Sequence, residues 1–182
     1  TRKKKGTWSV PEIINNELKA DTDCEVTGIS YDGSELYLVQ KDESNSDIFV
    51  SFFEDGTWSE IQALPPHINS EYNEIHASIS KDKRKLYFSS DRPGGFGALD
   101  IYVSERNTDG SWKEPSNLGK PVNSLYSENT PFITEDGKTL YFSSMSHATM
   151  GGYDIFYSNL LPNNRWSYPA NLGFPVNNTD DN

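Results

Sequence analysis

The sequence has few of the residues that cross-link a chain, bind a metal or enter a membrane. Cys24 is the only cysteine, so no disulfide can form within the chain and no cysteine pair has zinc-site spacing. None of the three histidines lies beside another or at a metal-binding spacing. No apolar run approaches the roughly 18 residues of a membrane-spanning helix, and no signal-peptide core is present at the start. We therefore expect no metal, no cofactor and no membrane span in this chain, although a targeting segment could lie upstream of it.

Positive charge is also scarce. The net charge is −11 over 182 residues, and four of the sixteen basic residues stand together at positions 2–5. Residues 6–182 alone therefore carry a net charge of −15. Proteins bind phosphate backbones through clustered lysine and arginine, so nucleic acid is not expected as a partner, and the basic cluster is interpreted as a solvated tail.

Aromatic residues make up 13% of the chain and recur at a fixed interval. The four tryptophans, at positions 8, 58, 112 and 166, are 50, 54 and 54 residues apart. A Leu-Tyr pair recurs at 36, 86 and 140, and an Asp-Ile pair at 47, 100 and 154. Periods of this size are typical of solenoids, propellers and arrays.

Each period contains four short β-strand signals. In the second copy they lie at 75–80, 85–90, 100–105 and 111–113, separated by turn residues. Four antiparallel strands per repeat predict a propeller blade. The segment between blades also repeats, as Pro-x-Asn-Leu-Gly and Pro-Val-Asn at 115–123 and 169–177, and its prolines predict that it forms no regular ladder.

We therefore predict an all-β fold, an arc of a β-propeller made of four-stranded antiparallel blades. The predicted parts are a basic tail and the outer strand of a preceding blade (1–22, with Trp8), blade 1 (23–71), blade 2 (72–125), and blade 3 with a C-terminal link (126–182). Three blades are fewer than the four to eight that close a ring. The two end faces of the arc are expected to be exposed and to favour self-association.

The chain resembles the TolB-like, WD-related propeller repeats of bacterial envelope proteins. The resemblance rests on Leu-Tyr-Phe-Ser-Ser-Asp-Arg at 86–92, the glycine loop at 94–97, Asp-Ile-Tyr-Val-Ser at 100–104 and residues 112–119. The linking segment is most similar to that of Bacteroidetes OmpA-family proteins of the PorE type. The first copy departs from the pattern, because residues 41–46 replace its glycine loop.

This resemblance implies a non-enzymatic scaffold in the periplasm, associated with the outer membrane and bound to envelope proteins or outer-membrane lipoproteins. The alternative is a fragment of a propeller glycosidase or sialidase. Catalysis of that kind would require carboxylates in the central channel, one of them with a raised pKa. No catalytic residue is predicted.

Two groups of recurring acidic residues precede or begin strands. Glu25, Glu74 and Glu128 are expected at one mouth of the channel, where they could hold a cation or, in the preferred interpretation, accept hydrogen bonds from the neighbouring link. The aspartates at 47, 100 and 154 are expected to accept hydrogen bonds from loop N–H groups.

The predicted contact surface lies on the long loops and links, at 91–99, 145–153 and 117–126, because binding residues concentrate on loops of rigid scaffolds. The side chains there that could anchor a partner are Arg92, Phe96, Tyr126, His147, Met150 and Tyr153. For Phe96 and Tyr153, packing within their own loops is an equal alternative.

Overall fold

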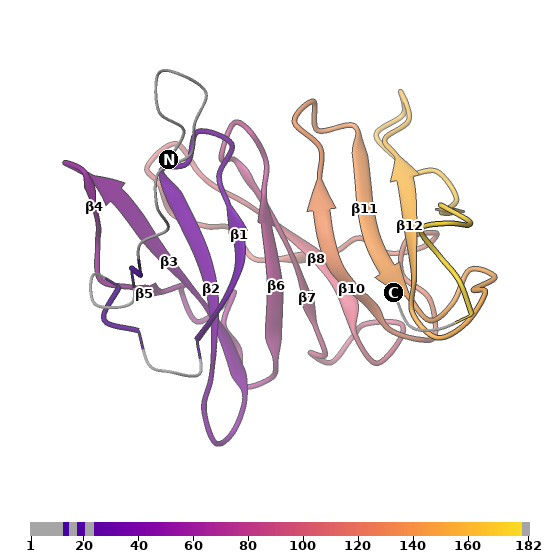
Figure 1. The fold of residues 1–182 in the computed structure, drawn as a ribbon, viewed down its shortest axis with the longest axis horizontal. Coiled ribbons are helices and arrows are strands. Elements are labelled where there is room, and N and C mark those ends of the chain that lie inside the picture. The colour runs from indigo at the N-terminus through magenta and orange to yellow at the C-terminus, as the bar shows by residue number, and fades with distance from the viewer. Residues whose placement is uncertain (1–12, 15–17, 21–23, 180–182) are drawn as a thin grey trace.

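The protein is built from three antiparallel β-sheets that stand side by side (Figure 1). The computed structural model describes residues 13–14, 18–20 and 24–179. The predicted basic tail at 2–5 and the predicted outer strand at Trp8 lie outside the described residues. The all-β fold of four-stranded antiparallel blades is confirmed.

In blades 2 and 3 the strands pair in chain order, and in blade 1 the last two strands both pair with the third. Blade 1 contains β1 (Cys24–Ile29), β2 (Glu35–Lys41), β3 (Ser46–Glu54), β4 (Thr57–Trp58) and β5 (Gln62–Ala63). Blade 2 contains β6 (Glu74–Ile79), β7 (Lys85–Ser90), β8 (Asp100–Glu105) and β9 (Ser116–Asn117). Blade 3 contains β10 (Glu128–Ile133), β11 (Thr139–Ser144), β12 (Asp154–Asn159) and β13 (Ala170–Asn171). The second and third strands of blade 2 have the predicted bounds.

The fourth strand of blade 2 was predicted at the wrong place. Trp112 forms only an isolated bridge with Arg106, whereas the ladder is made by Ser116 and Asn117, which pair with Val103 and Tyr102. The prediction that the link forms no ladder is therefore wrong. Proline bars pairing at its own position, but five residues lie between Pro115 and Pro121, and two of them, Ser116 and Asn117, form one short ladder.

The first strands of the three blades, β1, β6 and β10, lie next to one another. The Ala77 N–H donates to Thr27 Oγ1 over 3.2 Å, and the Tyr31 hydroxyl reaches across β6 to the carbonyl of Ile133 at 2.9 Å. A side chain at Gly28 would place its Cβ 2.4 Å from the carbonyl oxygen of Ala77. Glycine is therefore needed here for the close approach of two backbones.

Alternate residues of the middle strands fill the two junctions between blades. Tyr37, Ile48 and Val50 of blade 1 pack with Leu86 and Phe88 of blade 2. The other face of blade 2 presents Tyr87 and Ile101 to Leu140, Phe142 and Phe156 of blade 3. This alternation of period two follows from strand geometry, and each fully buried side chain of this size contributes about 1.5–3 kcal/mol.

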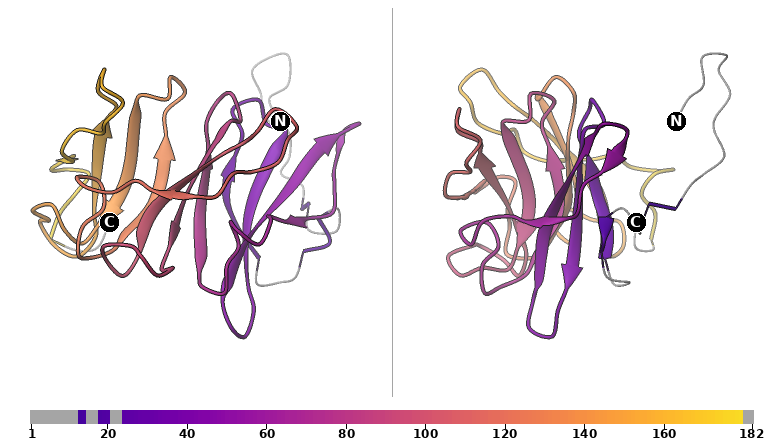
Figure 2. Two further views of the ribbon diagram at one scale, coloured as in Figure 1. Left: turned by 180° about the vertical axis from the view of Figure 1, so that it is seen from behind. Right: turned by 90° about the vertical axis from the view of Figure 1, so that its left-hand side faces the viewer.

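The outward face of blade 1 is not bare, which corrects the expectation for that end of the arc. Leu36 and Leu38 of β2 are covered by Leu18, with Ile14 and Ala20 packed beside it. Figure 2 (right) views the molecule from this side.

At the other end, strand alternation places Tyr141, Ile155 and Tyr157 on the outward face of blade 3. They stand in register with Tyr87, Ile101 and Val103 of blade 2, which blade 3 covers. All three are partly exposed. One end face of the arc therefore matches the expectation of an exposed face.

Candidate functional site

The predicted site residues lie at the end of the blades where the loops after β2, β7 and β11 meet the links between blades. We call it the loop end; in Figure 1 the β2–β3 loop marks it at the bottom of the view. The opposite end carries the short turns of the first hairpins.

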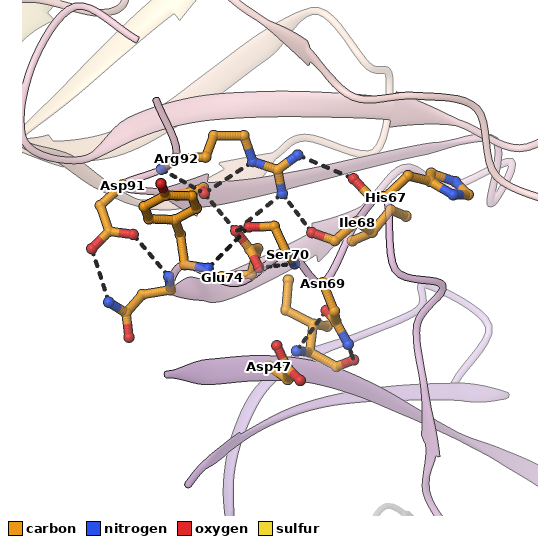
Figure 3. Close-up of polar contacts among 12 residues, drawn as sticks. Asp47, His67, Ile68, Asn69, Ser70, Glu74, Asp91 and Arg92 are labelled. Carbon is orange, nitrogen blue, oxygen red and sulfur yellow. Dashed lines mark hydrogen bonds and ion pairs between the residues drawn. The ribbon is translucent and has the colours of Figure 1, made fainter. Parts of the chain in front are cut away.

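Two buried carboxylates organise the loop end. Glu74 begins β6 and is fully buried; it accepts hydrogen bonds from the backbone and the hydroxyl of Ser70, at 2.6 and 2.8 Å, and from Ser90 at 2.6 Å (Figure 3). Glu128 is also fully buried and accepts the matching bonds from Ser124 and Ser144. Both therefore accept backbone hydrogen bonds from the preceding link, as the preferred interpretation predicts.

Arg92 is not available to a partner, which corrects its prediction as a binding anchor. Its guanidinium lies 3.0 Å from the Glu74 carboxylate and donates to the carbonyls of His67 and Ile68 (Figure 3). It also packs over the rings of Phe88 and Tyr102. Only 15% of its side chain is exposed. The buried negative charge of Glu74 needs a cation, and the loop supplies one.

His147 plays the corresponding part in blade 3, and its prediction as a binding anchor is corrected for the same reason. Its Nε2 lies 3.0 Å from the carbonyl of Val122 and 3.7 Å from Glu128, and its ring packs edge-on against Phe142 and Phe156. His147 stands one residue beyond the position that matches Arg92, with a positive φ of 60°. Sequence spacing alone did not pair these two residues.

Glu25 does not belong with the other two glutamates. By register, Cys24 opposes Gln40 as Glu74 opposes Ser90 and Glu128 opposes Ser144. Glu25 is exposed and borders a cleft of about 620 Å³ together with Asp42, Glu43 and His76. The interval of 49 residues from Glu25 to Glu74, against 50 for the Leu-Tyr pair, was the available signal of this shift.

Asp100 and Asp154 hold their loops as predicted. Asp100 accepts from the backbone N–H groups of Phe96 and Gly97 and from Asn117 Nδ2 at 3.0 Å. Asp154 accepts from Met150 N–H at 2.5 Å and from Asn171 Nδ2 at 2.8 Å. Both carboxylates are buried, so the loop conformation is fixed from within.

Asp47, the third member of this set, lacks most of these donors. Blade 1 has no glycine loop, and Ala63 stands where blade 2 has Asn117. Burial, followed by the negative charges of Glu74 and Asp42, raises the pKa of Asp47. The charged form of Asp47 therefore opposes folding.

We expect Asp47→Asn to raise the free energy of unfolding at pH 7. A carboxyl whose pKa is higher in the folded than in the unfolded chain contributes stability below its ordinary pKa and loses it as pH rises through the folded value. The gain should therefore vanish in acid, as measured by urea unfolding from pH 3 to 7.

Asp42→Asn is the matched control of opposite sign, because hydrogen bonds from Asn45 and Ser44 lower the pKa of Asp42. It should destabilise the protein at pH 7. An Asp47→Asn variant that is less stable than the parent at pH 7 would contradict the assignment.

Three predicted anchors are exposed. Phe96, Tyr126 and Met150 have exposed fractions of 42%, 59% and 47%. Tyr153 is half-buried. Lys120 Nζ lies 5.7 Å from the centre of the Phe96 ring. Of the six predicted anchors, the structure thus leaves Phe96, Tyr126 and Met150 accessible and buries most of Arg92 and His147.

Two further exposed residues were missed, Leu125 at 75% and Met145 at 46%. Leu125 directly precedes Tyr126 in the chain. The Met145 N–H donates to the Ser127 carbonyl at 3.3 Å, which places Met145 near Tyr126. The Ala98 N–H donates to the Tyr126 carbonyl at 3.1 Å, which brings the loop of Phe96 to the same place. We call the exposed set the loop-end patch; it comprises Phe96, Leu125, Tyr126, Met145 and Met150. Leu125 gave no signal in the sequence, since an apolar residue in a repeated link predicts packing as readily as exposure.

Among the described residues, no three His, Cys, Asp or Glu side chains group as a metal site would require. Within the same residues, no helix has the length and apolar character needed to cross a membrane. A hollow of about 510 Å³ runs along the first strands, where Ile29, Tyr31 and Phe132 are partly exposed.

No protein-family model matches the sequence, and no curated protein does. The solved structures that are similar in fold include two TolB proteins. The putative TolB from Agrobacterium tumefaciens superposes with a TM-score of 0.55 and 16% identity over 87% of this chain and 53% of its own. TolB from Acinetobacter baumannii gives 0.52 and 16% over 80% of this chain and 31% of its own. The chain therefore spans about half of these relatives or less, and its three sheets are blades of the β-propeller type found in TolB structures.

Proposed function

We propose that the chain is a non-enzymatic module of a larger β-propeller that binds a protein partner through the loop-end patch. The observation that carries this proposal is that charged and apolar side chains have separate roles at the loop end. The buried charged groups, Glu74, Arg92, Asp100, Glu128 and Asp154, are engaged within the fold, and the exposed apolar side chains are carried by loops those groups hold. Rigidly held apolar anchors bind partners at low entropic cost.

The place proposed for this activity is the periplasmic side of a bacterial outer membrane, with envelope proteins or outer-membrane lipoproteins as partners. Two observations support this proposal: the repeated sequence motifs resemble those of envelope propellers, and the fold is similar to that of TolB. A larger peptidoglycan-associated, OmpA-like parent protein is part of the same proposal.

The outward face of blade 3 supports the proposal that the chain belongs to a larger propeller. Tyr141, Ile155 and Tyr157 repeat the positions through which blade 2 contacts blade 3. We propose that a fourth blade covers them in the parent protein, and that two copies of this chain associate through them when it is isolated.

We expect the double variant Leu125→Ser/Tyr126→Ala to reduce partner recovery about tenfold. Both side chains are exposed, so stability should change by less than about 0.5 kcal/mol. Recovery is measured by pull-down from solubilised envelope, with quantification of each captured protein. Leu161→Ser/Tyr168→Ala is the matched control, because it removes an exposed leucine and tyrosine from the outer edge of blade 3. Equal recovery by both double variants would contradict the proposed site.

One observation favours a second candidate, a propeller glycosidase. Asp47, whose pKa is raised, directly follows Ser46 on the wall of the cleft bordered by Glu25, Asp42 and Glu43. Glycoside hydrolases use a carboxyl group with a raised pKa beside a second carboxyl group that is ionised. Hydrolysis of nitrophenyl glycosides that is lost in Asp47→Asn would establish this candidate and overturn the non-enzymatic one.

A further inference from the structure

The two junctions between blades differ in how their outer parts are filled. At the junction of blades 1 and 2, Arg106 donates to both carboxylate oxygens of Glu35, at 2.8 and 3.0 Å, and the Tyr37 hydroxyl donates to Glu35 at 2.7 Å. The guanidinium of Arg106 also packs on the ring of Trp112 at 4.4 Å. Every side chain of this set is satisfied by another, except the Nε of Arg106.

At the junction of blades 2 and 3 the matching positions carry different chemistry. Lys85 replaces Glu35, Leu160 replaces Arg106, Tyr87 matches Tyr37 and Trp166 matches Trp112. Leucine cannot bind a carboxylate or lay a cation on the indole. Trp166 instead meets Tyr87 edge-on, with ring centres 6.5 Å apart.

The result is a cleft of about 460 Å³, which we call the 2–3 cleft. Its walls include Lys85, Tyr87, Glu105, Lys113, Asn164 and Trp166. A second hollow of about 470 Å³ also borders Tyr87. The outer part of this junction is thus open where that of the other is closed.

The hydroxyl of Tyr87 is an unpaired polar group on the wall of the 2–3 cleft. The Tyr87 side chain is 4% exposed, yet its hydroxyl has no hydrogen-bond partner among the described residues, whereas that of Tyr37 has two. Burial, with the charges of Asp82 and Glu105, raises the pKa of Tyr87 to about 12. Among the described residues only Ser89 Oγ and Arg106 Nε are fully buried polar atoms without a partner, so the Tyr87 hydroxyl opens to the cleft that Tyr87 lines and is free to bond to a ligand there.

The lining also limits the chemistry of that ligand. Lys113 lies 2.9 Å and Lys85 3.9 Å from the Glu105 carboxylate, and Glu114 also lines the cleft, so two ammonium groups and two carboxylates balance there. A charged ligand would meet a like charge on one side. Hydroxyl, amide, ammonium and carboxylate groups facing one partly exposed indole suit a neutral molecule with many hydroxyl groups and a flat C–H face.

We propose that the 2–3 cleft binds a neutral saccharide, with its ring against Trp166 and a hydroxyl on Tyr87. This site lies at the outer rim of the blades, away from the loop-end patch, and it stands or falls independently of the proposed function. One or two sugar units fit a cleft of this size.

The test is a titration of the full chain, labelled with ¹⁵N, with glucose, galactose, N-acetylglucosamine and their β-linked disaccharides, followed at the Trp166 indole N–H by NMR. At least one sugar should shift that signal with saturation. Tyr87→Phe removes only the hydroxyl, and we expect it to weaken binding about five- to tenfold. Tyr141→Phe makes the same change on the outward face of blade 3 and should bind as the parent does.

A second variant tests the site by filling the 2–3 cleft with a new ion pair, and not by removing a contact with the sugar. Lys85→Glu/Leu160→Arg restores the pair found at the other junction and should abolish the saturable shift while keeping the fold, as checked by circular dichroism. The proposal is overturned if no sugar shifts the Trp166 signal, or if the closed variant and Tyr87→Phe both bind as tightly as the parent.

Discussion

Replacing Arg92 with methionine is expected to lower the free energy of unfolding by about 3–5 kcal/mol, the usual cost of breaking a buried ion pair from one side. Methionine retains most of the contacts with Phe88 and Tyr102 but leaves the fully buried Glu74 without its cation. It also leaves the carbonyls of His67 and Ile68 without a donor. Urea unfolding at pH 7 measures the loss.

Lys81→Met is the matched control, because Lys81 pairs with Glu135 at 2.7 Å and both side chains are more than half exposed. Exposed pairs contribute about 0–1 kcal/mol. Arg92→Lys should fall between the two, since lysine keeps the charge and loses the planar fork. An Arg92→Met protein as stable as Lys81→Met would show that Glu74 does not need Arg92.

Asn123→Leu is expected to cost about 1–3 kcal/mol, because it leaves the buried backbone N–H of Ile101 unpaired, while the Ile101 carbonyl keeps the hydrogen bond from the Leu118 N–H at 3.0 Å. The Asn123 side chain is 1% exposed; its oxygen accepts from Ile101 N–H at 2.9 Å and its amide donates to the Ile101 carbonyl at 2.9 Å. Leucine has a similar volume and can make neither bond.

Asn107→Leu is the control, since Asn107 is exposed and its amide bonds only to the Ser111 hydroxyl. It should change stability by less than about 0.5 kcal/mol. Asn69 and Asn177 form the same pair of bonds with Ile48 and Ile155, so leucine at either position should be costly too. A harmless Asn123→Leu would mean that water replaces the amide.

The sequence allowed the blades to be predicted because the repeat and strand alternation act together. The Leu-Tyr and Asp-Ile pairs mark the second and third strands, and their periodicity of two decides which residues enter each junction. The fourth strand was misplaced because Trp112 is a strong β-former, while Ser116 and Asn117 are not. A two-residue ladder has no periodicity to detect.

The site was harder to predict because its roles depend on contacts distant in sequence. Arg92 in a glycine-rich loop resembles an exposed anchor, and only the burial of Glu74, 18 residues earlier, turns it inward. Lys85 and Leu160 gave no signal in the sequence. They matter only because they stand where the other junction has the ion pair of Glu35 and Arg106. That comparison requires the register of two junctions.

The short fourth ladders have a consequence for solubility. A sheet edge recruits a strand from another molecule when a run of N–H and C=O groups lies open, and this is the usual route to fibrillar aggregates. Here β9 and β13 are two residues long and each directly follows a proline, Pro115 or Pro169. A foreign strand would find too few consecutive groups to pair with, so the rim of this all-β chain is protected against edge-to-edge growth.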